Sequence, residues 1–146
     1  MKKSLLFVLA LAVIPVGVDA QALDLEETRA RAEQGDVIAQ SNLGLMYARG
    51  DGVPEDDVEA VRWYRLAAEQ GHAEAEYNLG YMYDVGDGVP EDDAEAVRWY
   101  RLAADQGDAF AQYILAGMYH GGRGVPEDLA EAERWYRLAA DQGDAE

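Results

Sequence analysis

The sequence contains no cysteine, so disulfides are excluded and the fold has to be held by packing alone. Residues that carry nucleophilic or metal chemistry are also scarce. Beyond residue 20, serine and threonine occur only as Ser41 and Thr28, and the two histidines, His72 and His120, lie 48 residues apart. Neither acyl-transfer catalysis nor a zinc site has an obvious set of residues here. We therefore expect no catalytic residues, no metal and no cofactor.

Lysine is nearly absent too, occurring only at Lys2 and Lys3, and the formal net charge is −17. Removal of the first 20 residues would leave ten arginines against 28 carboxylates, a net charge of −18. Such an excess of negative charge repels nucleic acid and anionic lipid. We expect partners that are neutral or basic.

The apolar run LLFVLALAVI at Leu5–Ile14 is about half of the roughly 20 residues that a membrane-spanning helix needs. It follows a short basic start and precedes small residues, which is the pattern of a secretory signal peptide. We expect residues 1–20 to be the leader, cleaved after Ala20, with Ala22 as a second candidate position. The sequence thus predicts a periplasmic or secreted protein without a stable membrane anchor.

What the chain does contain is a repeat with a period of 36 residues. Three units follow one another without gaps, at 39–74, 75–110 and 111–146, and the first two are identical at 27 of 36 positions. The segment RARAEQGD at 29–36 aligns with the end of each unit, so residues 21–38 are expected to form an N-terminal capping helix, half of a repeat. Self-similarity at such a period is typical of solenoid proteins.

Each unit is predicted to form two helices, because apolar and small residues recur at helical spacing before and after a break, GDGVPEDD. Asp92 and Glu95 have the spacing of an N-cap and its reciprocal partner, and Gly107 suits a helix end. His72 stands where the other units have aspartate, which favours a role at a helix start. Only two residues separate the helices of successive units, so neighbouring helices have to be antiparallel. The predicted fold is all-α, an α-solenoid of stacked helix-turn-helix repeats.

The segment VRWYRLAA at Val61 and Val97, with ERWYRLAA at Glu133, recurs in all three units. Large aromatic residues at helical spacing normally belong to a core, so we interpret this segment as the packing face of the repeat rather than as a catalytic signature. Arg98 and Arg101 have Glu95 and Asp105 within three or four residues. We expect these arginines to form solvated pairs along the helix.

The order Ala75-x-x-x-Leu79-Gly80-x-x-Tyr83, then GDGV, then Ala96-x-x-Trp99-Tyr100-x-x-Ala103-Ala104-x-Gln106-Gly107 closely resembles the Sel-1-like repeat (SLR), a relative of the tetratricopeptide repeat. The resemblance covers Ala39 to Glu146. It implies a solenoid whose first helices line a concave face, and it implies protein interaction rather than chemistry. Some secreted SLR proteins resemble penicillin-binding or β-lactamase-type proteins, so a cell-wall-active hydrolase is the alternative. Those relatives are cysteine-rich, whereas this chain has no cysteine.

The first helix of each unit carries a second stripe, opposite its core residues, where five of the nine differences between the first two units fall. Three tyrosines outside the repeated core positions also lie on it, and tyrosine is well suited to recognition. Isolated exposed tyrosines without function are the simpler interpretation. We predict that the stripe binds an extended peptide or protein segment. The predicted site residues are Ser41, Asn42, Leu45, Arg49, Tyr77, Asn78, Tyr81, Asp84, Tyr113 and His120.

The third unit departs from the pattern, with Ile114, Ala116 and Leu129 in place of Asn, Gly and Asp. Repeat arrays need end faces that tolerate water. We therefore expect the outer side of the last helix, including Trp135 or Tyr136, to be less covered than its counterparts. We predict weak self-association or docking of a partner there, with a sequence that continues beyond residue 146 as the alternative. A self-assembling structural module is a further possibility for the whole protein.

Overall fold

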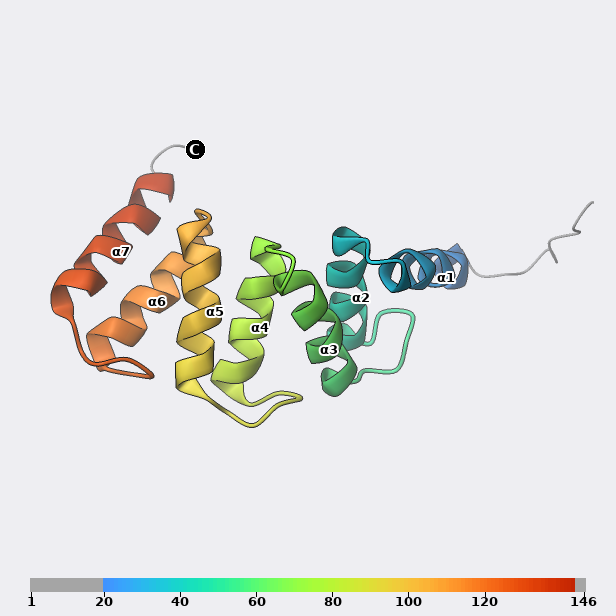
Figure 1. Ribbon diagram of the computed structural model, residues 1–146, viewed down its shortest axis with the longest axis horizontal. Coiled ribbons are helices and arrows are strands. Elements are labelled where there is room, and N and C mark those ends of the chain that lie inside the picture. Colours follow the sequence, from blue (N-terminus) through green and yellow to red (C-terminus); the bar gives the residue numbers. More distant parts are fainter. Residues whose placement is uncertain (1–19, 144–146) are drawn as a thin grey trace, which may run out of the picture.

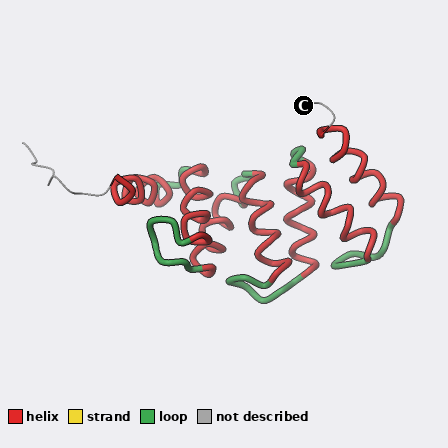
Figure 2. Tube along the Cα trace, turned by 180° about the vertical axis from the view of Figure 1, so that it is seen from behind, coloured by secondary structure: helices red, strands yellow, loops and turns green. Residues whose placement is uncertain are grey.

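The computed structural model describes residues 20–143, and these residues form seven α-helices and no strand (Figures 1 and 2). The helices are α1 (Ala20–Glu33), α2 (Val37–Arg49), α3 (Asp57–Ala68), α4 (Ala73–Val85), α5 (Asp93–Asp105), α6 (Ala109–Gly121) and α7 (Leu129–Gly143). The all-α prediction is confirmed. The predicted leader, apart from Ala20, lies outside the described residues.

The helices pack in chain order as antiparallel hairpins, α2 with α3, α4 with α5, and α6 with α7, while α1 packs on α2. Figure 1 shows α1 and α7 at opposite ends of the resulting row. The extensive contacts in the described part of the chain join consecutive helices, as in a solenoid. Among residues 20–143 no helix combines the length and the apolar character needed to cross a bilayer.

Helix starts follow the capping chemistry of the sequence. The Asp36 and Asp108 carboxylates each accept a hydrogen bond from the backbone N–H of the residue three positions later. His72 caps its helix in the same way, because its Nδ1 accepts from Ala75 N at 3.3 Å. Asp92 Oδ1 accepts from Glu95 N at 3.0 Å. Glu95 pairs with Arg98 rather than returning a bond to the cap, so the expected reciprocal half of the capping box is wrong.

Close approach inside the first two hairpins depends on a glycine facing a tyrosine. A Cβ on Gly44 would lie 2.7 Å from the Tyr64 ring, and one on Gly80 would lie 2.9 Å from the Tyr100 ring. These tyrosines are buried with the alanines of the recurring segment, which confirms that the segment is a packing face. The aromatic ring fills the space that the missing side chain leaves.

Successive units are joined by a repeated set of polar contacts. Gln70 and Gln106, which follow the second helices of the first two units, donate to the carbonyls of Gly35 and Gly71 in the segment that precedes their own unit, at 3.3 and 3.0 Å. Inside each unit, the same glutamine donates to the side chain of the fourth residue of the first helix: Gln70 to Gln40, Gln106 to Glu76 and Gln142 to Gln112, at 2.7, 2.7 and 2.8 Å. An arginine of one unit also donates to a tyrosine hydroxyl of the next, as Arg65 does to Tyr83 at 2.6 Å. These contacts fix the angle at which one hairpin follows another.

Two sequence-based expectations need correction. Arg98 pairs with Glu95 as expected, but Arg101 donates to the Tyr119 hydroxyl of the next unit rather than pairing with Asp105. Trp135 is only 4% exposed, like its counterparts, because the guanidinium of Arg134 lies 4.3 Å over its ring and its side chain belongs to a buried cluster with alanines of α5 and α6. Tyr136 is partly exposed where Tyr100 is fully buried, as expected.

Candidate functional site

A pocket of about 310 Å³ lies on the first-helix face, between α2 and α4. Its lining brings together four of the predicted site residues, which are Leu45, Arg49, Asn78 and Tyr81. The remaining lining residues are Ala48, Asp57, Tyr64, Met82 and Asp87. The helical repeat places Asn78 and Tyr81 on one side of α4, one turn apart, and the 36-residue period sets α2 alongside with Leu45 at the position equivalent to Tyr81.

The chemistry of this pocket is mixed. Leu45 and the Tyr81 ring offer apolar surface, and the Asn78 amide offers both a donor and an acceptor. Arg49 carries the positive charge of the lining, and Asp57 and Asp87 carry its negative charges. Burial raises the pKa of Tyr64 to about 12, with the positive charge of Arg49 opposing the shift, so its phenol stays protonated at neutral pH. Such a surface suits an extended chain with uncharged and basic groups.

Tyr77 is held in place rather than free. Its ring lies 5.8 Å from that of Tyr100 and 6.4 Å from that of Phe110, and the side chain is half-buried between them. Burial raises the pKa of Tyr77, and the nearby negative charge of Asp108 adds to the effect. Tyr77 is thus packed against neighbouring rings, whereas the Tyr81 ring, one turn further along α4, is exposed.

Asp84 is anchored by residues that the sequence analysis did not select. Arg123, from the loop of the third unit, forms ion pairs with Asp84 and, at 2.7 Å, with Asp93. The Tyr100 hydroxyl donates to the same Asp84 carboxylate at 3.4 Å. Arg123 stands where the other two loops have aspartate, and this exchange of charge is the sequence signal that identifies it.

The prediction that Ser41 belongs to the binding stripe is wrong, because Ser41 is buried, at 4% exposure. It occupies the position of Tyr77 and Tyr113, and its short side chain ends below the surface that those rings reach. Asn42, Arg49 and His120 are exposed, as a binding role requires, while Leu45 and Asn78 are partly covered.

Tyr113 lies apart from this pocket, in a second one of about 670 Å³ at the far end of the solenoid. The lining is Ala109, Phe110, Tyr113, Tyr136, Ala139 and Ala140, without any charged side chain. The Tyr113 and Tyr136 rings meet edge to face at 5.4 Å. The predicted stripe is thus divided into two surfaces, a mixed groove between α2 and α4 and an apolar pocket on α6 and α7.

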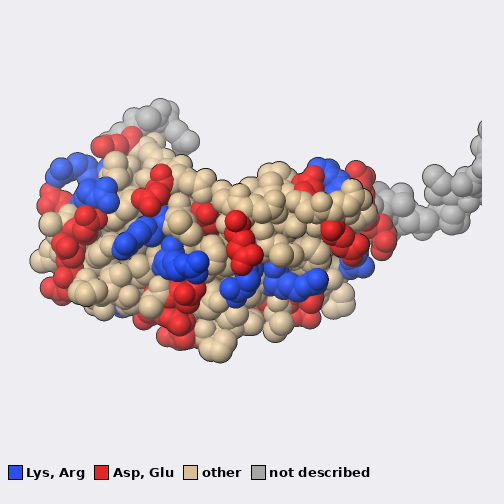
Figure 3. Space-filling view, viewed as in Figure 1, with Lys and Arg blue, Asp and Glu red and all other residues tan. Residues whose placement is uncertain are grey.

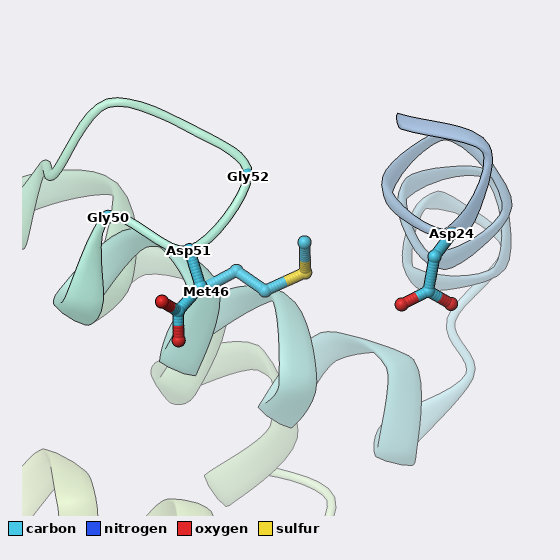
Figure 4. A pocket seen from close by; sticks show the side chains of 5 residues that line it. All are labelled: Asp24, Met46, Gly50, Asp51 and Gly52. Carbon is cyan, nitrogen blue, oxygen red and sulfur yellow. The ribbon is translucent and has the colours of Figure 1, made fainter. Parts of the chain in front are cut away.

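A third pocket, of about 460 Å³, lies at the opposite end between α1 and the loop after α2, where the Met46 side chain extends toward Asp24 (Figure 4). Its other lining residues are Gly50, Asp51 and Gly52, and none of its residues belongs to the predicted site. Within residues 20–143 no three His, Asp or Glu side chains gather in a way that would hold a metal ion. On the face shown in Figure 3, arginines and carboxylates are interspersed.

Comparisons with known proteins give a consistent result. A family model described as the Sel1 repeat matches the chain three times, at residues 37–72, 73–108 and 109–144. Each match has the 36-residue period of the sequence and starts at the first residue of α2, α4 or α6. No curated protein matches the chain.

Solved structures are similar over most of the chain. A protective antigen present in uropathogenic Escherichia coli strains, which displays an SLR fold, is 45% identical with a TM-score of 0.83 over 84% of this chain. The chain spans only 26% of that antigen's length. A Sel1 repeat protein from Oxalobacter formigenes is 44% identical, TM-score 0.75, covering 82% of this chain and 90% of the other. The Helicobacter pylori cysteine rich protein B shares the fold, with a TM-score of 0.66 and 19% identity. That match covers 87% of this chain and 94% of the other.

Proposed function

Because the chain belongs to the Sel1 repeat family, whose repeats commonly form protein-interaction scaffolds, we propose that it is a non-catalytic scaffold that binds a peptide segment of another protein. The binding surface is the groove between α2 and α4. The single observation that carries the proposal is the pocket that joins Leu45, Arg49, Asn78 and Tyr81 from two successive units.

The ligand in this proposal is an extended segment that is neutral or basic. Asn42 and Asn78 occupy equivalent positions one unit apart, and each amide has a donor and an acceptor for a peptide backbone. Tyr81 and Tyr77 supply apolar contact at low cost in side-chain entropy. The whole chain has a net charge of −17, and carboxylates lie near the groove. This negative charge attracts a basic segment over long range. We expect so short a groove to bind its ligand with micromolar affinity, which corresponds to about −8 kcal/mol.

A scarcity of catalytic groups supports the non-catalytic part of the proposal. Ser41, the only serine beyond residue 20, is buried, and Thr28 is the only threonine. A nucleophile has to lie within hydrogen-bond reach of a base and be open to substrate. A nitrocefin or muropeptide turnover assay tests the hydrolase alternative, and measurable turnover by the purified protein would reject a purely binding role.

The groove is tested by replacing the two side chains that project from α4 into it. A peptide selected from a displayed random library against the wild-type protein serves as the ligand. Asn78→Ala with Tyr81→Ala should weaken its binding by about tenfold or more, roughly 1.4 kcal/mol, measured by isothermal titration calorimetry. The melting temperature should change little, because neither side chain belongs to the buried core. Higher salt should weaken binding of a basic peptide further.

The matched control carries two substitutions of exposed apolar side chains on α3, Val58→Ala with Leu66→Ala. This variant should bind the peptide as the wild type does. Equal binding by the folded groove variant would place the interaction on another surface and reject the groove.

Export remains part of the proposal and rests on the sequence of residues 1–20. The basic start, the apolar run and the small residues before Ala20 support a leader that is removed on passage out of the cytoplasm. The intact mass of the protein recovered from the periplasm or the medium is the test. Recovery of the uncleaved chain in the cytoplasm would reject export.

A further inference from the structure

The apolar pocket at the end of the solenoid is the periodic continuation of the two joints between units. Shifted by 36 residues, Tyr136, Ala139 and Ala140 correspond to Tyr100, Ala103 and Ala104, which are buried against α6. The same face of the first unit is buried against α4. Among the described residues no helix covers the third face, and α7 is the last helix of the row (Figure 1).

The two internal joints show what such a face binds. Both are covered by a first helix that presents a small residue, then Gln or Glu, then a leucine three residues later: Ala75, Glu76 and Leu79 in α4, and Ala111, Gln112 and Leu115 in α6. Gln112 Nε2 donates to the Ala104 carbonyl at 3.2 Å. Gln40 makes the same bond to the Ala32 carbonyl where α2 meets α1. The equivalent acceptor on the third face is the carbonyl of Ala140, in the last turn of α7.

One substitution limits how much of a following unit this face accepts. Val61 and Val97 are buried and share apolar clusters with Val89 and Val125, valines from the loop of the next unit. The third face has Glu133 at this position, exposed and paired with Arg137. A following loop would have to bury that carboxylate, which is costly, whereas a single helix over Ala139 and Ala140 leaves it in water.

A second substitution shapes the pocket. The position of Gly44 and Gly80 is Ala116 in the third unit, so the space beneath the tyrosine contains a methyl group. The Tyr136 ring accordingly lies toward Gly117 and Tyr113 and forms a wall of the pocket instead of filling the hairpin. Phe110, 74% exposed, and Tyr113, 63% exposed, form the opposite wall.

We propose that this end face binds one helix of a partner protein, with the small–Gln–x–x–Leu pattern of the first helices, whose leucine enters the pocket of Phe110, Tyr113 and Tyr136. The partner helix lays its small residue against Ala139 and Ala140 and donates from its glutamine to the Ala140 carbonyl. This site is separate from the groove between α2 and α4.

The probe is a fluorescein-labelled synthetic peptide of residues 36–50, which contains this pattern as Ala39, Gln40 and Leu43 with its own N-cap, Asp36. Fluorescence anisotropy should show binding to the wild-type protein with a dissociation constant of about 100 μM, since the short peptide has to fold on binding. Ala140→Glu should weaken binding at least tenfold. The same change two residues earlier, Leu138→Glu, lies outside the pocket at a site exposed in every unit and should leave binding unchanged. A peptide with Leu43→Asp should not bind.

Circular dichroism establishes that both protein variants are folded. The groove variant Asn78→Ala with Tyr81→Ala should bind the helical peptide normally, so failure of one site is distinguished from failure of the other. Equal binding to wild type and Ala140→Glu, or no binding at about 1 mM peptide, would overturn the proposal. Reversible dimerisation of the protein alone, abolished by Ala140→Glu in sedimentation experiments, would also overturn it, because a second copy would then be the occupant.

Discussion

At the residue scale, single glycines decide how closely the helices of a hairpin approach. Gly80 lies under the ring of the fully buried Tyr100, and a Cβ there would be 2.9 Å from the ring. Gly117 lies one residue further along the equivalent helix of the third unit, where a Cβ would meet nothing nearer than the Tyr136 hydroxyl at 3.6 Å. The two positions share a helical backbone and differ in the space around them.

We predict opposite signs for the same substitution at these positions. Gly80→Ala should destabilise the protein by about 1–3 kcal/mol, because the overpacked ring outweighs the roughly 1 kcal/mol that alanine gains in a helix. Gly117→Ala should raise the free energy of unfolding by up to about 1 kcal/mol. Urea denaturation followed by circular dichroism measures both. Stabilisation by Gly80→Ala would show that the ring moves aside freely.

Glu76 is the unusual member of the polar contacts that join the units. It is 3% exposed and occupies the position of Gln40 and Gln112, each of which donates to a backbone carbonyl. An ionised carboxylate cannot donate. Burial raises the pKa of Glu76, while the hydrogen bond from Gln106 and the nearby His72 oppose the shift. Only the protonated form could donate to a backbone carbonyl as the two glutamines do.

The replacement Glu76→Gln should stabilise the protein at pH 7 by about 1 kcal/mol, since the amide donates where the carboxylate cannot. A carboxyl whose pKa is raised on folding contributes stability below its unfolded pKa and loses it as the pH rises through the folded pKa. The difference from wild type should therefore shrink toward pH 4. Melting curves across this range test it, with the exposed Glu55→Gln as control for the lost charge. A difference independent of pH would exclude the titration of Glu76.

At the scale of the elements, the loop between the two helices of a unit contacts the preceding unit directly. Gly88 has φ +70°, and a Cβ on it would lie 2.3 Å from the carbonyl oxygen of Asp57, at the start of α3. Gly52 has nearly the same backbone, φ +73°, but only the flexible Met46 side chain lies near, at 3.6 Å. The same loop position is thus a joint in one unit and open surface in another.

Alanine at these two glycines separates backbone strain from docking. Both substitutions place an alanine in the left-handed backbone conformation, which costs about 1–2 kcal/mol of stability. Gly88→Ala should cost at least about 1 kcal/mol more, because the loop has to move off the first turn of α3. Chemical denaturation of the two single variants gives the difference directly. Equal losses would mean that the loop contact contributes nothing to the joint.

At the scale of the whole molecule, stability is distributed along a row in which each hairpin contacts its neighbours. Deletion of residues 109–146 should therefore lower the melting temperature while the remaining helices stay folded. Far-ultraviolet circular dichroism, normalised per residue, should stay close to that of the full chain. Complete loss of the helical signal in the truncated protein would contradict a solenoid.

The sequence by itself determined the period, the two helices of each unit and their caps. These features depend on local chemistry: helical spacing of small and apolar residues, aspartate or His72 at helix starts, and glycine at helix ends. Repetition made the inference stronger, because each local signal appears three times. The expected exposure of Tyr81 and the partial exposure of Tyr136 also followed from position in the pattern.

Only the tertiary structure decided which of the predicted site residues meet. Ser41 is buried because its side chain is too short to reach the surface that tyrosine reaches at the same position. Asp84 is anchored by Arg123 from 39 residues away, a contact that no local pattern encodes. Tyr113 lines a different pocket from Asn78 and Tyr81, together with Phe110 and Tyr136, so a stripe that is continuous in the alignment becomes two surfaces in space.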